Sequence, residues 1–359
     1  MLRLKPVPTG LMAECAMTGA YIAQSEGEYP RAIAVTREAM QALEAAGLQR
    51  TSRYTSIAHE HARSLLLAGN YHDAWAAEQA VMSIVKSTGR ANSAPYFAML
   101  NVGSTALLSG GQPHKVIELL TATETEVRSS IPDAELPFYL QATRLLADSA
   151  AGAAPAADWG LMKSAAIAEQ QGAGAGAVMY RLGAIGTALD RGDVAAADEY
   201  WSSVAALETH TADAAGRRVA VKALITHAAL DLARHDPNAA SQHIGQATAL
   251  VPGTRRADHP DWRRLLLVRV QVEYALAQYP AAAQDAAALV ARARREAVDP
   301  RSSAWIGEAL VWQSRVELAQ GKRDAAQADA KEAIAHLQQN LDPSHPLIAT
   351  ARRIAGGPT

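Results

Sequence analysis

The chain has 359 residues, of which 80 are alanine and only 18 are aromatic. This composition argues against a β sandwich or barrel, which needs β-branched and aromatic side chains, and it predicts an all-α chain because alanine has the highest helix propensity. The 34 basic and 36 acidic residues leave a formal charge of −2, so composition does not indicate nucleic acid, and no apolar run is long enough to predict a membrane-spanning helix.

Residues 1–8 precede the first predicted helix, and we expect them to form a short disordered lead. Arg3 and Lys5 stand before an apolar stretch, but Glu14 interrupts that stretch early, which argues against a signal peptide. From residue 9 onward a turn recurs every 40 to 44 residues. The predicted turns begin at Gly27, Gly69, Gly111, Gly152, Gly192, His235, Ala277 and Gly321.

Each turn separates two predicted helices. The segment before the turn is typical of one helix, the turn residue ends it because glycine adopts the left-handed conformation readily, and the segment after it is typical of a second helix. Five residues after the turn residue stands alanine in seven of the eight cases, with Val116 as the exception. Such a small side chain lets two helices cross closely, and a helix pair of this kind must stack on its neighbours to bury its faces.

The pattern Gly-x-Tyr-x-x-Ala, present at 27–32 and at 69–74, resembles the turn of the tetratricopeptide repeat. The period of about 42 residues resembles the kinesin-light-chain type, as does the Asp-His-Pro element at 258–260. The resemblance implies a right-handed α-solenoid of about eight helix-turn-helix repeats. It would form a single domain over residues 9–359, and residues 346–355 would be a C-terminal capping helix.

In the tetratricopeptide architecture the first helix of each repeat lines a concave groove. Positions 13, 10, 6 and 3 residues before each turn share one helix face and give the expected lining. The candidate binding residues are Tyr21, His59, Arg63, Asn101, Thr105, Arg264, Gln271, Tyr274 and Arg315. This mixture of arginine, amide and tyrosine suits an extended peptide, although packing or solvent exposure explains any one residue equally well.

Catalytic residues, metal ligands and cofactors are not expected. His59 and His61 are two positions apart on a helix and point in different directions, so they cannot share an ion. The glycines at 172, 174 and 176 follow no predicted strand and indicate a linker rather than a phosphate loop. Nine arginines and six acids between residues 255 and 301 favour a solvated face with ion pairs over a nucleic-acid surface.

The leading hypothesis is therefore a non-catalytic scaffold, or the recognition arm of a bacterial-type signalling protein, whose concave groove binds a protein or an extended peptide. The alternative is a regulatory solenoid that senses a ligand or signal peptide and is attached to a kinase or transcription regulator. The single cysteine, Cys15, is expected to be a small buried residue and indicates a reducing compartment, so we expect a cytoplasmic protein.

Overall fold

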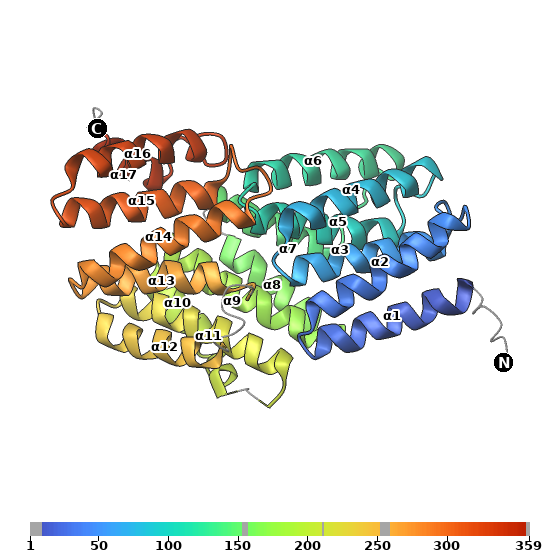
Figure 1. The fold of residues 1–359 in the computed structure, drawn as a ribbon, viewed down its shortest axis with the longest axis horizontal. Coiled ribbons are helices and arrows are strands. Elements are labelled where there is room, and N and C mark those ends of the chain that lie inside the picture. The colour runs from blue at the N-terminus through green and yellow to red at the C-terminus, as the bar shows by residue number, and fades with distance from the viewer. Residues whose placement is uncertain (1–8, 153–156, 210–211, 252–258, 357–359) are drawn as a thin grey trace, which may run out of the picture. The chain divides into compact units, whose positions relative to one another are not determined.

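The computed structural model describes residues 9–152, 157–209, 212–251 and 259–356, and within these ranges it is all-α with no strand (Figure 1). The expected disordered lead at residues 1–8 lies outside the described residues, as does Asp258. The helices are α1 (Thr9–Ser25), α2 (Tyr29–Ala45), α3 (Ser52–Leu67), α4 (Tyr71–Ser87), α5 (Ala94–Ser109), α6 (Pro113–Ser130), α7 (Phe138–Ala151), α8 (Ala157–Gln170), α9 (Gly174–Asp190), α10 (Val194–Trp201), the 3-10 helix η1 (Ala205–Thr209), α11 (Ala214–Ala233), α12 (Pro237–Leu250), α13 (Trp262–Ala275), α14 (Tyr279–Glu296), α15 (Ala304–Ala319), α16 (Arg323–Leu337) and α17 (Pro346–Ile354).

The chain divides into two compact units, Met1–Ala106 and Leu107–Thr359. The boundary falls inside α5, so the first unit contains α1–α4 and most of α5, and the second unit contains the remaining helices. The expectation of a single domain over residues 9–359 stays a prediction. Within each unit, consecutive helices pack as antiparallel hairpins, and each hairpin corresponds to one period of the sequence.

All eight expected turn residues have a positive φ, between 57° and 88°. In the seven turns whose next residue the structure describes, the amide of that residue donates back to a carbonyl five residues earlier, as Lys322 N does to Glu317 O at 2.9 Å, which closes the end of the helix. Six of these residues are glycine, whereas His235 and Ala277 adopt the same conformation with a Cβ. A Cβ in the left-handed region costs about 1–2 kcal/mol. The turn keeps its left-handed geometry at His235 and Ala277 despite this cost.

Small residues lie where the paired helices cross. The residue five positions after each turn residue is at most 1% exposed in all eight repeats, including Val116. Seven residues before the turn, the side chains of Ala20, Ala62 and Ser314 are also fully buried. The alanine-rich composition therefore supplies thin, close-packed interfaces between helices rather than one large central core.

The fifth hairpin departs from this regular pattern. Its second helix, α10, has 8 residues, whereas α4 and α14 have 17 and 18. The hydroxyls of Ser202 and Ser203 donate to the carbonyls of Glu199 and Tyr200 at 2.7 Å, and bonds of this kind compete with helix continuation. The short η1 follows where the helix would continue, so the regular second helix that the sequence predicts is wrong for this repeat.

Within the second unit, segments that are far apart in sequence meet at what we call the closing contact. The turn between α5 and α6 (Leu108–Gln112) lies against the segment that enters α15 (Val298–Trp305) (Figure 1). Ala304 N donates to Gly111 O at 2.9 Å, and Trp305 Nε1 donates to Leu108 O at 2.8 Å. The closing contact thus joins repeats about 190 residues apart, beyond the nearest-neighbour stacking expected of a helical repeat.

The two ends of the described chain also bear on the sequence-based expectations. Helix α17 packs on α15 and α16, and it keeps Arg352 and Arg353 exposed, in the place expected for a capping helix. Cys15, which was expected to be buried, is exposed. It lies on α1, whose described helical neighbours α2 and α3 cover only one side of the helix.

Candidate functional site

In the first unit, the predicted residues Tyr21 and Arg63 come together from α1 and α3. The Arg63 guanidinium carbon lies 5.4 Å from the centre of the Tyr21 ring, and Arg63 NH1 lies 3.4 Å from Glu60 Oε2. Gln24 donates to Ser64 Oγ at 2.9 Å and also contacts Glu60. Burial and the Glu60 carboxylate raise the pKa of Tyr21, so this phenol stays protonated and can donate a hydrogen bond at neutral pH.

The other predicted residues of this unit are engaged by their own helices or by the next one. His59 Nδ1 is hydrogen bonded to Glu78 on α4. Burial raises the pKa of Glu78 to about 7, although His59 opposes the shift. Thr105 Oγ1 donates to the Asn101 carbonyl at 2.7 Å, and both residues are half-buried. His59 and Thr105 therefore use these polar groups for hydrogen bonds within the unit.

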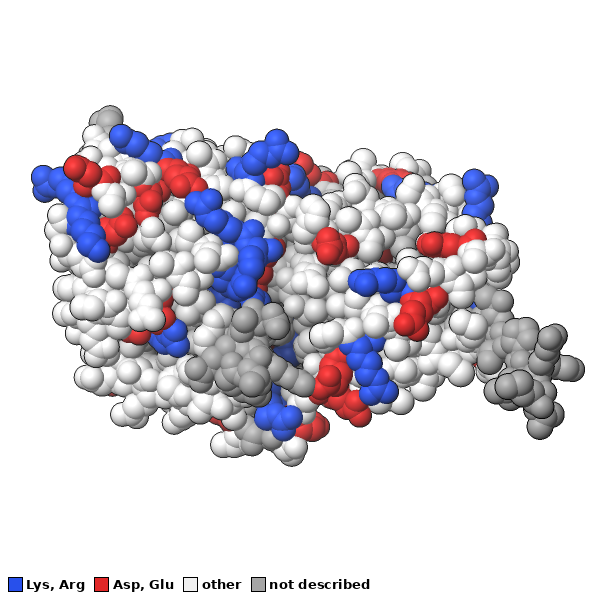
Figure 2. Space-filling model, viewed as in Figure 1, with Lys and Arg blue, Asp and Glu red and all other residues white. Residues whose placement is uncertain are grey.

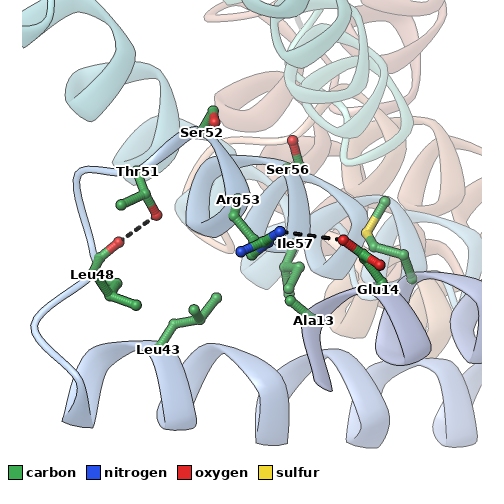
Figure 3. A pocket seen from close by; sticks show the side chains of 10 residues that line it. Ala13, Glu14, Leu43, Leu48, Thr51, Ser52, Arg53, Ser56 and Ile57 are labelled. Atoms are coloured by element: carbon green, nitrogen blue, oxygen red, sulfur yellow. Dashed lines mark hydrogen bonds and ion pairs between the residues drawn. The ribbon is translucent and has the colours of Figure 1, made fainter. Parts of the chain in front are cut away.

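A hollow of about 550 Å³ opens between α1, α2 and α3 (Figure 3). Its lining includes Glu14, Met17 and Ser56. Each of these residues stands thirteen or ten positions before a turn residue, where the sequence predicts groove-lining side chains. Arg53 NH2 lies 3.2 Å from Glu14 Oε1 and spans the hollow from α3 to α1. Both side chains are largely exposed, so an incoming charged group can exchange with this ion pair at little cost.

In the second unit, four first helices contribute to what we call the inner charge cluster, which consists of Asp190, Lys222, Asp261, Arg264 and Glu308. Lys222 Nζ lies 2.5 Å from Asp261 Oδ1. Arg264, a predicted residue, interacts electrostatically with Asp190 at the end of α9 and with Glu308 on α15. The cluster therefore brings together α9, α11, α13 and α15.

The protonation equilibria of the inner charge cluster are shifted by burial. Burial raises the pKa of Glu308, against the effect of nearby arginines, and it lowers the pKa of Lys222. Burial alone would raise the pKa of Asp261 too, but Lys222 and Arg218 outweigh it and hold that pKa below its usual range. Charged groups that are poorly hydrated in this way interact strongly with a charged or polar ligand.

A second feature of this unit is an aromatic–arginine cluster formed by Tyr274, Trp312 and Arg315. The Arg315 guanidinium carbon lies 4.0 Å from the centre of the Trp312 ring system and 4.9 Å from the Tyr274 ring. The two aromatic rings meet edge to face at 6.0 Å. All three side chains are half-buried, so the cluster is ordered yet still accessible. Gln271 lies one helical turn before Tyr274 and is also half-buried.

Of the arginines between residues 255 and 301, most of those in the described part of the chain (from residue 259 onward) pair with acids. Arg263 Nε lies 3.4 Å from Glu296 Oε2, and Arg292 Nε lies 2.5 Å from Glu296 Oε1. Arg294 pairs with Glu332 at 2.6 Å. Figure 2 shows Lys and Arg gathered in the middle of the viewed face, over the C-terminal end of α14, with mixed groups of both signs elsewhere on that face. These ion pairs agree with the expected internal pairing. Arg292 and Glu296 are buried, however, so this part of the expected solvated face lies inside the protein.

The structure therefore pairs Tyr21 with Arg63 and Tyr274 with Arg315, and it places Arg264 in the inner charge cluster. The sequence analysis missed Asp190, Lys222 and Glu308 as cluster members, and Trp312 as a neighbour of Arg315. A signal for two of them was present, because Lys222 and Glu308 stand thirteen residues before a turn, in the same phase as Arg264. Among the helices that the structure describes, none is both long and apolar enough to cross a membrane.

Comparison with known proteins gives similarity at the level of the fold. No protein-family model matches the sequence, and no curated protein matches it. Among solved structures, the chain is similar to one from the crystal structure of the APC/C hetero-tetramer Cut9–Hcn1, with a TM-score of 0.51 and 13% identity over 95% of this chain and 55% of that chain. It therefore spans about half the length of that protein. A tetratricopeptide repeat protein from Parabacteroides merdae ATCC 43184 is matched at 12% identity, over 97% of this chain and all of that one, with a TM-score of 0.32.

The hairpin repeats, their left-handed turns and the similarity to the Cut9–Hcn1 structure define the fold. It is the all-α fold of a tetratricopeptide-type helical repeat. The kinesin-light-chain subtype and the right-handed twist stay predictions.

Proposed function

We propose that this protein is a non-catalytic binding protein that holds a protein or an extended peptide on the inner faces of its first helices, as a scaffold or as the recognition arm of a signalling protein. The observation that carries this proposal is the aromatic–arginine cluster of Tyr274, Trp312 and Arg315. These three residue types dominate binding energy at protein interfaces, and here they lie together, half-buried and ordered.

The cluster suits a segment that presents carbonyl or carboxylate oxygens. Stacking on Trp312 and Tyr274 fixes the plane of the Arg315 guanidinium, and a guanidinium that stacks through its face keeps its N–H groups at the edge. These N–H groups can donate to two oxygens of a peptide at once. Because the side chains are already ordered, little conformational entropy remains to be lost on binding.

The experiment is a pull-down followed by measurement of Kd for the recovered segment. We expect the Arg63/Asn101/Arg264/Arg315 quadruple alanine variant, and the Tyr274→Ala/Arg315→Ala double variant, to bind at least about tenfold more weakly. Arg301→Ala is the matched control, because the Arg301 side chain is 97% exposed and lies on the loop before α15. Unchanged Kd values in variants with wild-type circular dichroism would contradict binding at the inner faces.

A second candidate function is the sensing of a small charged ligand by the inner charge cluster, in a regulator linked to a kinase or transcription factor. The observation that favours it is the convergence of ionisable side chains from four helices, among which burial shifts the pKa values of Lys222 and Glu308. Thermal-shift screening against a low-molecular-weight fraction of cell extract tests it. We expect a stabilising fraction whose effect is lost in Arg264→Ala, and no such fraction if the first proposal alone is correct.

The cellular setting is part of the proposal. The single cysteine is the sequence feature that supports a cytoplasmic location, because one thiol cannot form an intramolecular disulfide. Fractionation of cells that express the full chain would test it.

A further inference from the structure

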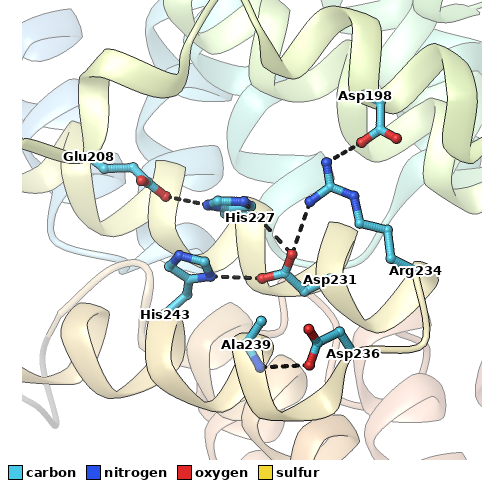
Figure 4. Close-up of polar contacts among 8 residues, drawn as sticks. All are labelled: Asp198, Glu208, His227, Asp231, Arg234, Asp236, Ala239 and His243. Carbon is cyan, nitrogen blue, oxygen red and sulfur yellow. Dashed lines mark hydrogen bonds and ion pairs between the residues drawn. The ribbon is translucent and has the colours of Figure 1, made fainter.

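Three potential metal ligands converge beside the irregular fifth hairpin. Glu208 lies on η1, His227 on α11 and His243 on α12, and one ligand atom from each lies within 4.8 Å of the other two. His227 Nδ1 is already 2.8 Å from Glu208 Oε1. Figure 4 shows the two imidazoles one above the other, with Glu208 on one side and Asp231 on the other.

A second layer of polar groups orients these ligands. Asp231 Oδ2 lies 2.7 Å from His243 Nδ1, and Asp231 Oδ1 lies 3.8 Å from His227 Nε2. Arg234 NH1 donates to the same carboxylate at 3.1 Å. A carboxylate on one ring nitrogen of histidine is the usual partner of a metal-binding histidine, because it fixes the tautomer and leaves the other nitrogen free. Here that arrangement leaves Nε2 of His243 as its ligand atom.

The surroundings of the group are partly closed. Trp201 stacks on His227 with 4.4 Å between ring centres, and His227 stacks on His243 at 3.9 Å. The side chains of Glu208, His227 and His243 are about one-fifth exposed, whereas that of Asp231 is 5% exposed. An ion here would keep access to water at one position while its ligands are held by packing.

The place of this group in the fold is an independent observation. A regular second helix would continue past Trp201, but α10 ends there and η1 carries Glu208 toward α11 and α12. Departures from a regular pattern tend to mark sites with a function beyond folding. The irregularity is what brings the carboxylate to the two imidazoles.

We propose that Glu208, His227 and His243 form a binding site for a divalent transition metal ion of the zinc class, with Asp231 as the residue that orients His243. Two imidazole nitrogens and one carboxylate oxygen form a ligand set that zinc uses, with water in the fourth position. Zinc–ligand distances are about 2.0–2.2 Å, so the ligand atoms must move closer together than in the hydrogen-bonded arrangement. The soft terminal torsions of histidine and glutamate allow this without moving the helices. The bound ion would tie η1 to the α11–α12 hairpin.

The test is zinc binding by the full chain after removal of metal with a chelator. We expect isothermal titration with zinc alone to give one ion per chain, and zinc to raise the midpoint of thermal unfolding. His243→Gln and Glu208→Gln should lose both effects, and Asp231→Asn should weaken zinc binding by about 10–100-fold. His114→Gln is the matched control, because His114 also lies near a carboxylate, with Nε2 3.9 Å from Asp342 Oδ1, but is not one of the proposed ligands.

Two measurements keep the proposal open to refutation if a variant does not fold. Circular dichroism reports whether each variant is helical. For the wild-type chain, Co²⁺ in place of zinc should give the visible absorption of a nitrogen- and oxygen-ligated ion. Absence of stoichiometric zinc or cobalt binding in the wild type would overturn the proposal, as would zinc binding that is equal in the wild type, His243→Gln and Glu208→Gln. Either result leaves the binding function proposed for the inner faces untouched.

Discussion

Replacement of Gly111 by alanine isolates the contribution of the closing contact to stability. Gly111 has a φ of 83°, so alanine there costs about 1–2 kcal/mol for backbone conformation alone. A Cβ at this position would also overlap Ser303 Oγ and would lie 3.0 Å from Trp305 Cδ1. The Ser303 side chain must therefore rotate away, and the start of α15 must also move, because Trp305 N would lie only 3.1 Å from the added Cβ.

The expected magnitude follows from the hydrogen bonds that this movement breaks. Ser303 Oγ donates to Gly110 O at 3.2 Å, Ala304 N to Gly111 O at 2.9 Å and Trp305 Nε1 to Leu108 O at 2.8 Å. At about 0.5–1.5 kcal/mol each, their loss costs about 2–4 kcal/mol in addition to the backbone strain. We expect Gly111→Ala to lower the free energy of unfolding by about 3–6 kcal/mol.

The matched control is Gly321→Ala. Gly321 occupies the same kind of turn with a φ of 78°, but a Cβ there meets nothing within 4 Å. Urea unfolding should show a loss of only about 1–2 kcal/mol for this control. Hydrogen exchange should show that the Ala304 amide loses protection in Gly111→Ala alone. Equal destabilisation by the two variants, with the Ala304 amide still protected, would refute the closing contact as a stabilising feature.

Three further predictions concern the repeats. His235→Gly and Ala277→Gly should each stabilise the protein by about 0.5–1 kcal/mol in urea unfolding, because both residues have a positive φ. A loss of stability would contradict the idea that these residues strain the backbone. Ala282→Val should destabilise by about 1–3 kcal/mol, because Ala282 is fully buried at a helix crossing, whereas Ala281→Val on the exposed face of α14 should be nearly neutral. For Glu78, whose pKa of about 7 in the folded state lies above the ordinary 4.5, the folded state binds a proton more tightly than the unfolded state. Stability should therefore fall as pH rises from about 4.5 to 7, with this residue contributing about 2–3 kcal/mol of the fall. Unfolding experiments at pH 5 and 7 should show that Glu78→Gln removes this part of the pH dependence.

The candidate site was predictable only in part. Arg264 and Arg315 could be placed on the inner face of the first helices, because a residue's position relative to its turn is a local property of one hairpin. Lys222 and Glu308 stand at the same position relative to their turns as Arg264 does. No sequence pattern links Glu208, His227 and His243, because they lie on three different elements, η1, α11 and α12. Their convergence depends on where α10 ends.

The sequence by itself determined the period, the eight turns and the small residues at the helix crossings. These are local features: a left-handed turn residue and a small side chain a few positions later act within one hairpin, whatever the neighbours do. Only the tertiary structure decided that the second unit closes between residues 108–112 and 298–305. That contact depends on the summed rotation of the hairpins between the two segments, including the shortened α10. Small differences in each hairpin accumulate over about 190 residues and decide whether the two segments meet.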